Sequence, residues 1–203
     1  LDDGDITVAS MAKASTTAMV LTVTNVPVNA GGVLDIDGNI TAATAALTIK
    51  TDNNASTIKV GGNVTENIVA IKFQLDTTAT LEFDGTTKNI DGIIDGIADA
   101  EGTLSLNGIT EIDEAVGGAN HLLNITVATG KTGDFNAAVN SVGLTTVGTG
   151  SINFDAAVGI DTIVNNGTIT LNSTLDNEAA DGDATLTMTG ADSVLNIYGS
   201  ANI

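Results

Sequence analysis

A seven-residue pattern that recurs along the chain constrains the fold more than any other feature of the sequence. Its eight copies are GVLDIDG (32–38), STIKVGG (56–62), ATLEFDG (79–85), GTLSLNG (102–108), GSINFDA (150–156), GTITLNS (167–173), ATLTMTG (184–190) and SVLNIYG (193–199). The centre of each copy is apolar, polar, apolar, and Leu47-Thr48-Ile49 and Leu123-Asn124-Ile125 are weaker copies. Side chains of a strand alternate between its two faces. Each copy therefore predicts a short strand with two buried apolar residues, followed by a bend.

The spacing of the copies favours a solenoid. The first four copies begin 24, 23 and 23 residues apart, and those at 150, 167 and 184 are 17 residues apart. Such periods are typical of stacked repeats that bury one continuous core. We therefore expect an all-β parallel β-helix (β-solenoid) with coils of about 17–24 residues over residues 31–203. Residues 1–30 are expected to form an N-terminal capping element or the first coil, and 109–149 an irregular coil.

More strand-like sequence lies between the copies, at 66–73, 143–148 and 161–167. The core would be thin and aliphatic, since the chain has four Phe, one Tyr and no Trp. An antiparallel β-sandwich is the alternative fold, because Asp84-Gly85 and Asn107-Gly108 suit two-residue hairpin turns.

Composition excludes several classes of function. The chain has 25 acidic residues against six basic ones, a net charge of −19, which disfavours nucleic-acid binding. It has no cysteine and therefore no disulfide or thiolate site. No apolar run reaches the length of a membrane-spanning helix, so we expect no membrane insertion of this segment. Because the chain opens with LDDGD, without Met or a leader, we expect it to be a segment of a longer protein.

Acidic residues around glycines are candidate calcium ligands, since calcium takes six to eight oxygens from a bending backbone. The candidates are Asp2, Asp3 and Asp5, then Asp35, Asp37 and Asn39, then Asp181 and Asp183. None of these segments completes a twelve-residue EF-hand loop. The alternative is that they are solvated turn residues.

Catalytic motifs are weak. Segment 91–102 carries Asp91, Asp95, Asp99 and Glu101 and is expected to form a solvated loop or a turn of helix between coils. His121 is the only histidine, and no GxSxG motif accompanies it. The sequence therefore predicts no enzyme. A carbohydrate-active enzyme is the remaining catalytic alternative, but the pattern places Phe83 and Phe154 inward, away from any sugar.

Three segments carry a resemblance to a known family: 102–108, 148–175 and 184–203. Their repeats, rich in Ala, Gly, Thr and Asn, resemble the passenger region of bacterial autotransporters, most closely the large surface antigens of rickettsia-like bacteria. The resemblance implies a right-handed parallel β-helix displayed on the outer membrane, acting in adhesion, surface coating or immune exposure. It implies no catalytic residue.

These observations predict a non-catalytic extracellular protein of a bacterial cell surface. Outward polar residues such as Asp35, Lys59, Glu82 and Ser105 would present a hydrophilic face, and loops would carry specificity. The expected partners are a host-cell receptor, a surface glycan, or copies of the chain itself. The alternative is a self-assembling S-layer or filament subunit with calcium-linked contacts.

Overall fold

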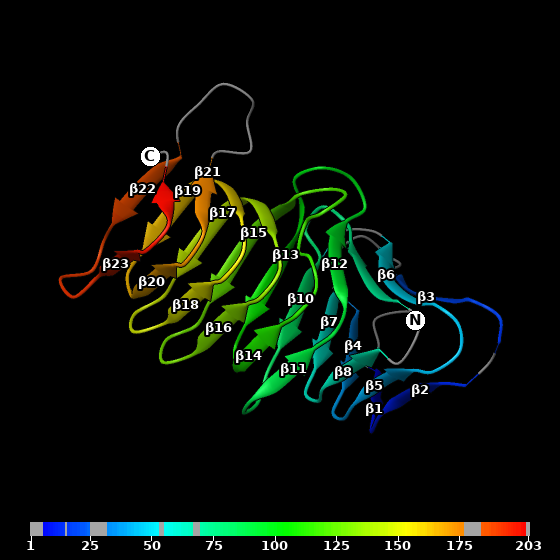
Figure 1. Cartoon of the computed structure of the whole chain (residues 1–203). Helices are drawn as coiled ribbons and strands as arrows, with labels where there is room; N and C mark the ends of the chain where they lie inside the picture. The colour runs from blue at the N-terminus through cyan, green and yellow to red at the C-terminus, as the bar shows by residue number, and fades with distance from the viewer. Residues whose placement is uncertain are drawn as a thin grey trace.

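The computed structural model describes residues 6–14, 16–24, 32–52, 55–66, 70–176 and 184–201. All of the helices and strands assigned in these ranges are β-strands, with no helix among them. Each strand pairs in parallel with a strand of a neighbouring coil. Figure 1 shows the coils stacked in chain order, with β1, β2 and β3 (blue) at one end and β22, β23 and β24 (orange to red) at the other. The predicted β-solenoid is confirmed, and the antiparallel sandwich was wrong.

The first face of the solenoid is the longest sheet. It contains β1 (Ile6–Val8), β4 (Val33–Ile36), β7 (Thr57–Val60), β10 (Thr80–Phe83), β13 (Glu101–Leu106), β15 (Leu122–Val127), β17 (Val139–Thr146), β19 (Val158–Asn165), β21 (Thr174–Asp176), β22 (Thr185–Met188) and β24 (Ser200–Ala201). The C-terminal half of β19 pairs with β22 and its N-terminal half with β21.

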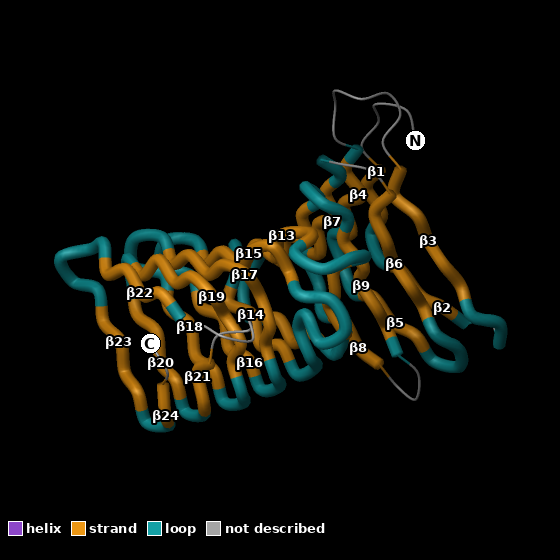
Figure 2. The backbone as a smooth tube through the Cα atoms, turned by 90° about the horizontal axis from the view of Figure 1, so that it is seen from above, coloured by secondary structure: helices purple, strands orange, loops and turns teal. Residues whose placement is uncertain are grey.

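Two further faces close the coils. The second face contains β2 (Met11–Lys13), β5 (Ile40–Ala42), β8 (Val64–Glu66), β11 (Lys88–Ile90), β14 (Ile109–Ile112), β16 (Thr132–Phe135), β18 (Ser151–Phe154), β20 (Thr168–Leu171) and β23 (Val194–Ile197). The third face contains β3 (Met19–Thr24), β6 (Leu47–Asp52), β9 (Ile71–Leu75) and β12 (Ile93–Gly96). Figure 2 shows this third sheet beside only the N-terminal half of the molecule.

The repeated pattern occupies two different faces. The copies at 32, 56, 79, 102 and 184 lie on the first face, and those at 150, 167 and 193 lie on the second. Within a face the copies align residue for residue, so that Leu81 lies between Ile58 and Leu104. These three side chains are fully buried. The interior is thus built of vertical columns of like apolar side chains.

Coils shorten from the N-terminus as far as β20 because the third face narrows, and the last coil is longer again. Ile58, Leu81 and Leu104 are spaced by 23 residues, whereas Val139 and Val158 are only 19 apart in register. After β12, the only described third-face residue of the next coil that pairs with its neighbours is Val116, which bridges Ile94 and Val139. In the following coils the first residues of β17 and β19, from Val139 and Val158, take this place. These eight-residue strands bend and serve two faces without an intervening turn.

Several local expectations were wrong. Segment 109–149 is mostly regular, with strands β14 to β17, and its irregular part is 113–121. Asn107-Gly108 is not a hairpin turn, because it joins β13 to β14 on the next face. In the weaker copy around Asn124, Leu123 is 40 % exposed and Leu122 is buried instead, since β15 bends at this point.

Glycine is required where the chain turns from the first face to the second. A Cβ on Gly62 would lie 2.2 Å from the carbonyl carbon of Gly38, and one on Gly167 would lie 1.9 Å from the oxygen of Gly150. Successive coils therefore touch backbone to backbone at this corner.

The last coil is the least buried. Met188 is 43 % and Ile197 42 % exposed, and Tyr198 is 76 % exposed. In the described part of the chain no further coil packs on them. None of the described residues forms a helix that could cross a membrane.

Candidate functional site

The calcium candidates that can be placed lie at the corner between β4 and β5. Asp35 faces outward on β4 opposite Lys59, and its pKa is raised, chiefly by burial and by the charge of Asp37. The Asn39 amide oxygen accepts a hydrogen bond of 2.9 Å from the backbone N–H of Asn63. Asn63 repeats that contact to Asn89 at 3.2 Å. Asn39 therefore joins coils.

The other calcium candidates cannot be placed. Asp2, Asp3, Asp5, Asp181 and Asp183 lie outside the described residues. Within the ranges that the structure describes, no three His, Cys, Asp or Glu side chains gather as a metal site would require. Calcium binding stays a prediction.

Carboxylates cluster at the corner between the second and third faces. Asp91 and Asp113 follow β11 and β14 at the same position, one coil apart. Burial raises the pKa of Asp91, and so do a hydrogen bond with Asp113 and the charges of Asp113 and Glu114. Burial also raises the pKa of Glu66, which accepts a hydrogen bond from the Ile71 N–H. Like charges one coil apart thus favour protonation here.

Further along the same corner, asparagines separate the carboxylates. The Asn153 amide donates to Asp134 at 2.8 Å and to Asp155 at 3.0 Å. The Asn172 amide of the next coil donates to Asn153 at 2.9 Å and to Asp155 at 2.6 Å. The Asn136 amide likewise bridges Glu111 and Asp113. This ladder ties successive coils together along their outer edge.

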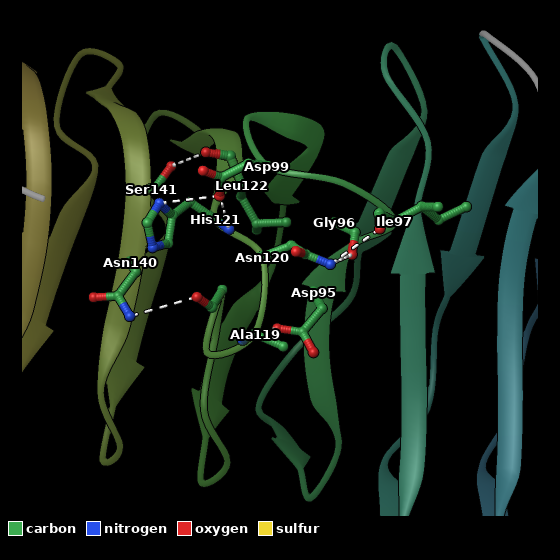
Figure 3. A network of polar contacts seen from close by, with 11 residues as sticks. Asp95, Gly96, Ile97, Asp99, Ala119, Asn120, His121, Leu122, Asn140 and Ser141 are labelled. Atoms are coloured by element: carbon green, nitrogen blue, oxygen red, sulfur yellow. Dashed lines mark hydrogen bonds and ion pairs between the residues drawn. The ribbon is translucent and has the colours of Figure 1, made fainter. Parts of the chain in front are cut away.

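Segment 91–102 was wrongly expected to be a solvated loop. It contains strand β12, and Asp95 is buried at 1 % exposure. The Asp95 carboxylate pairs with Lys72 at 2.7 Å and accepts the Ala119 N–H at 3.0 Å. Figure 3 shows the segment around Ala119 and Asn120 lying against β12, with the Asn120 amide directed to the carbonyls of Gly96 and Ile97.

His121 belongs to the same network. Its Nδ1 lies 3.2 Å from the Asp99 carboxylate, and its backbone N–H donates to Asp99 at 2.9 Å. Ser141, which Figure 3 shows nearby, is fully buried, and its hydroxyl contacts the carbonyls of Leu122 and Gly143. A serine engaged in this way is not placed as a nucleophile. The arrangement orders the coil where the third face narrows.

Two uncharged outward columns run along the C-terminal half of the first face, and we call these two columns the threonine face. Its two outward columns are Thr103, Asn124, Gly143, Thr162 and Thr185, and beside them Ser105, Thr126, Thr145, Val164 and Thr187. Asp35, Lys59 and Glu82 occupy the second column in earlier coils. Charge therefore ends within the second column at Ser105, while Glu101 of β13 and Asp161 of β19 lie beside the two columns.

A pocket of about 270 Å³ opens at the corner beyond the threonine face, and we call it the corner pocket. Its lining residues are Gly148, Thr149, Asn166, Gly167, Thr168, Gly190, Ala191 and Asp192. It exists because turn lengths differ between coils. Only residues 166–167 connect β19 to β20, whereas 147–150 and 189–193 form the longer turns on either side. The short turn leaves a notch between its neighbours.

Two buried polar residues hold the floor of the corner pocket. The Thr146 hydroxyl donates to the Asn165 amide oxygen at 2.7 Å, and that oxygen also accepts the Gly167 N–H at 3.0 Å. The Asn165 amide nitrogen donates to the Val194 carbonyl at 2.8 Å. The signal in the sequence was a polar residue at the last inward position of two neighbouring strands, Thr146 of β17 and Asn165 of β19, which the repeat pattern did not include.

The phenylalanines lie inside the solenoid. Phe83 and Phe154 are buried, as predicted. Phe73 packs edge-on against Phe83 with centroids 6.1 Å apart, and Phe135 stacks on Phe154 at 5.2 Å. Among the aromatic residues that the structure describes, Tyr198 alone has an exposed ring.

No protein-family model, no curated protein and no solved structure matches this chain.

Proposed function

We propose that this chain is part of an extracellular bacterial surface protein that acts without catalysis, in adhesion or surface coating. The observation that carries the proposal is the outer surface of the solenoid, where polar columns run across successive coils on the first and second faces. Such a scaffold holds many equivalent polar groups at fixed spacing, which suits contact with an extended surface.

Charge and composition support an exposed location. The net charge of −19 keeps such a surface hydrated and repels other acidic surfaces. The absence of cysteine makes folding independent of the redox state of the compartment. The inter-coil ladder around Asn153 adds stiffness without metal or disulfide bonds.

The test is the accessibility of the protein on intact cells. Antibodies raised against the purified chain should label living cells of the source organism, and brief external protease should remove that labelling. A cytoplasmic enzyme of the same cells should stay protected and serves as the integrity control. Labelling that appears only after the cells are permeabilised would contradict the proposal.

A self-assembling subunit is the second candidate, favoured by the apolar side chains exposed on the two end coils. Met188 and Ile197 at one end, and Met19 and Val20 on β3 at the other, are 39–60 % exposed. Among the described residues no strand pairs with the outer edges of the two end coils, and these edges of parallel strands are complementary, so a second copy could complete them.

Light scattering after size-exclusion chromatography, in calcium and then in EDTA, separates the two candidates. A monomer in both conditions supports the adhesive scaffold. Assemblies that dissolve in EDTA would support a calcium-linked lattice or filament.

A further inference from the structure

We propose that the threonine face and the adjoining corner pocket form a binding site for a neutral polysaccharide. This inference rests on the proposed function, because it assigns the adhesive contact to one surface and one class of partner. Two independent observations carry it: the charge distribution of the first face and the pocket beside it.

The charge distribution points to an uncharged partner. Within the two outward columns of the threonine face, every side chain is a hydroxyl, an amide, an aliphatic group or hydrogen. The second face at the same height carries Glu111 and Asp134 in its outward column. In a chain of net charge −19, a neutral ligand that lies along these two columns meets uncharged positions and desolvates no charge within them. Glu101 and Asp161 lie at their edges.

The geometry points to a polymer that carries hydroxyl groups. Neighbouring strands are about 4.8 Å apart, and alternate residues along a strand about 6.7 Å apart, so the threonine face is a two-dimensional lattice of polar groups. A threonine hydroxyl donates one hydrogen bond and accepts others, as a sugar hydroxyl does. A chain of sugars lying across β13, β15, β17 and β19, which are side by side in Figure 1, would meet equivalent groups on each coil.

The corner pocket supplies depth to an otherwise flat surface. Its volume of about 270 Å³ is slightly below that of sites for drug-sized molecules, which suits a single sugar ring. Thr149, Asn166 and Thr168 line it with neutral polar groups, and Asp192 is the one charged residue among its lining. Asp192 can accept hydrogen bonds from a pair of sugar hydroxyls.

The pocket is preorganised for binding. The Thr146–Asn165 pair holds its floor, and Gly167 packs against the backbone of Gly150. The threonine face ends two or three residues before the pocket in each coil, at Thr145, Val164 and Thr187. Because the site is already rigid, binding a ligand there loses little conformational entropy.

The experiment is retention of the purified chain on insoluble polysaccharides. The neutral probes are microcrystalline cellulose, chitin and a β-1,3-glucan, and alginate beads are the anionic probe. At least one neutral polymer should deplete the chain from solution, with little dependence on salt, because no ion pair is involved. Alginate should not retain it.

Variants locate the site. The double variant Thr126→Lys/Thr145→Lys should weaken retention by about tenfold, because lysine side chains cover the lattice and carry charge. Ala191→Ile, which adds bulk to the pocket wall, should weaken it several-fold. Thr41→Lys/Thr65→Lys, the same substitutions at exposed positions of the second face, is the matched control and should bind as the parent does. Circular dichroism and thermal unfolding confirm that each variant folds.

Three results would overturn the inference: no retention on any neutral polymer, equal retention by Thr126→Lys/Thr145→Lys, or retention by alginate alone. The labelling of intact cells is a separate measurement. Surface labelling without retention would contradict the glycan site and leave the proposed function in place. Retention without surface labelling would support the glycan site and contradict the proposed surface location.

Discussion

Lys72 and Asp95 form an ion pair of 2.7 Å between the neighbouring strands β9 and β12. The Asp95 side chain is 2 % exposed and that of Lys72 30 % exposed. The same carboxylate accepts the Ala119 N–H, so the pair joins the last two strands of the third face to the segment that covers them. It lies where the solenoid changes from a long coil to a short one.

Lys72→Met should therefore destabilise the fold by about 3 kcal/mol, because it leaves the buried Asp95 carboxylate without a countercharge. Lys59→Met is the control: Lys59 faces Asp35 on the half-buried outer surface, and its loss should cost less than about 1 kcal/mol. Urea unfolding followed by circular dichroism measures both. Equal losses would show that the Lys72–Asp95 pair has no special role.

Gly167→Ala should destabilise the chain by about 2 kcal/mol, since the new methyl group would overlap the Gly150 carbonyl and force two coils apart. Gly118→Ala is the matched control. A Cβ there meets only the Ala115 side chain, at 3.4 Å, and the substitution should be neutral or slightly stabilising. The comparison of their thermal unfolding midpoints tests whether close coil stacking requires glycine at the corner.

Asn165→Ala should destabilise the fold by about 3 kcal/mol, because it removes the partner of the buried Thr146 hydroxyl and of the Val194 carbonyl. It should also loosen the floor of the corner pocket. Hydrogen exchange should then speed up at the Gly167 amide, which donates to Asn165 in the parent chain. Unchanged exchange there would contradict the proposed role of Asn165.

Asp91→Asn should stabilise the chain at pH 7. The folded-state pKa of Asp91 lies above its ordinary value of 3.8, because burial and Asp113 disfavour the charged form. The folded chain then binds this proton more tightly than the unfolded chain. Its contribution to stability is present at low pH and is lost as the pH rises through the raised pKa. The gain at pH 7 should be below about 1 kcal/mol, since the site is partly exposed.

The pH profile checks that assignment. Between pH 4 and 7 the parent should lose more stability than Asp91→Asn does. Asp155→Asn is the control, because Asp155 accepts hydrogen bonds from Asn153 and Asn172 and is already compensated. A larger gain from Asp155→Asn than from Asp91→Asn would contradict the account of the carboxylate cluster.

Much of the fold could be predicted from local pattern. The alternation around Leu81-Glu82-Phe83 correctly predicted a strand with Leu81 and Phe83 buried. The 23-residue period predicted the solenoid, because units that cannot bury an apolar face alone must stack. The candidate binding site was harder to predict from the sequence. Thr126 follows the weaker copy at 123–125, and Thr145 lies in the strand-like segment 143–148 between the copies. Their alignment with Ser105 is known only from the register of the strands.

The sequence by itself determined that the copies form strands, most of their inward and outward positions, and the need to stack, since these depend on residues close together along the chain. The tertiary structure decided which face each copy occupies, because that depends on which strand of the preceding coil the copy pairs with. It also decided the burial of Asp95 and the corner pocket beside Asn166. Both arise where segments of different length lie against each other in neighbouring coils, and no local pattern encodes that difference.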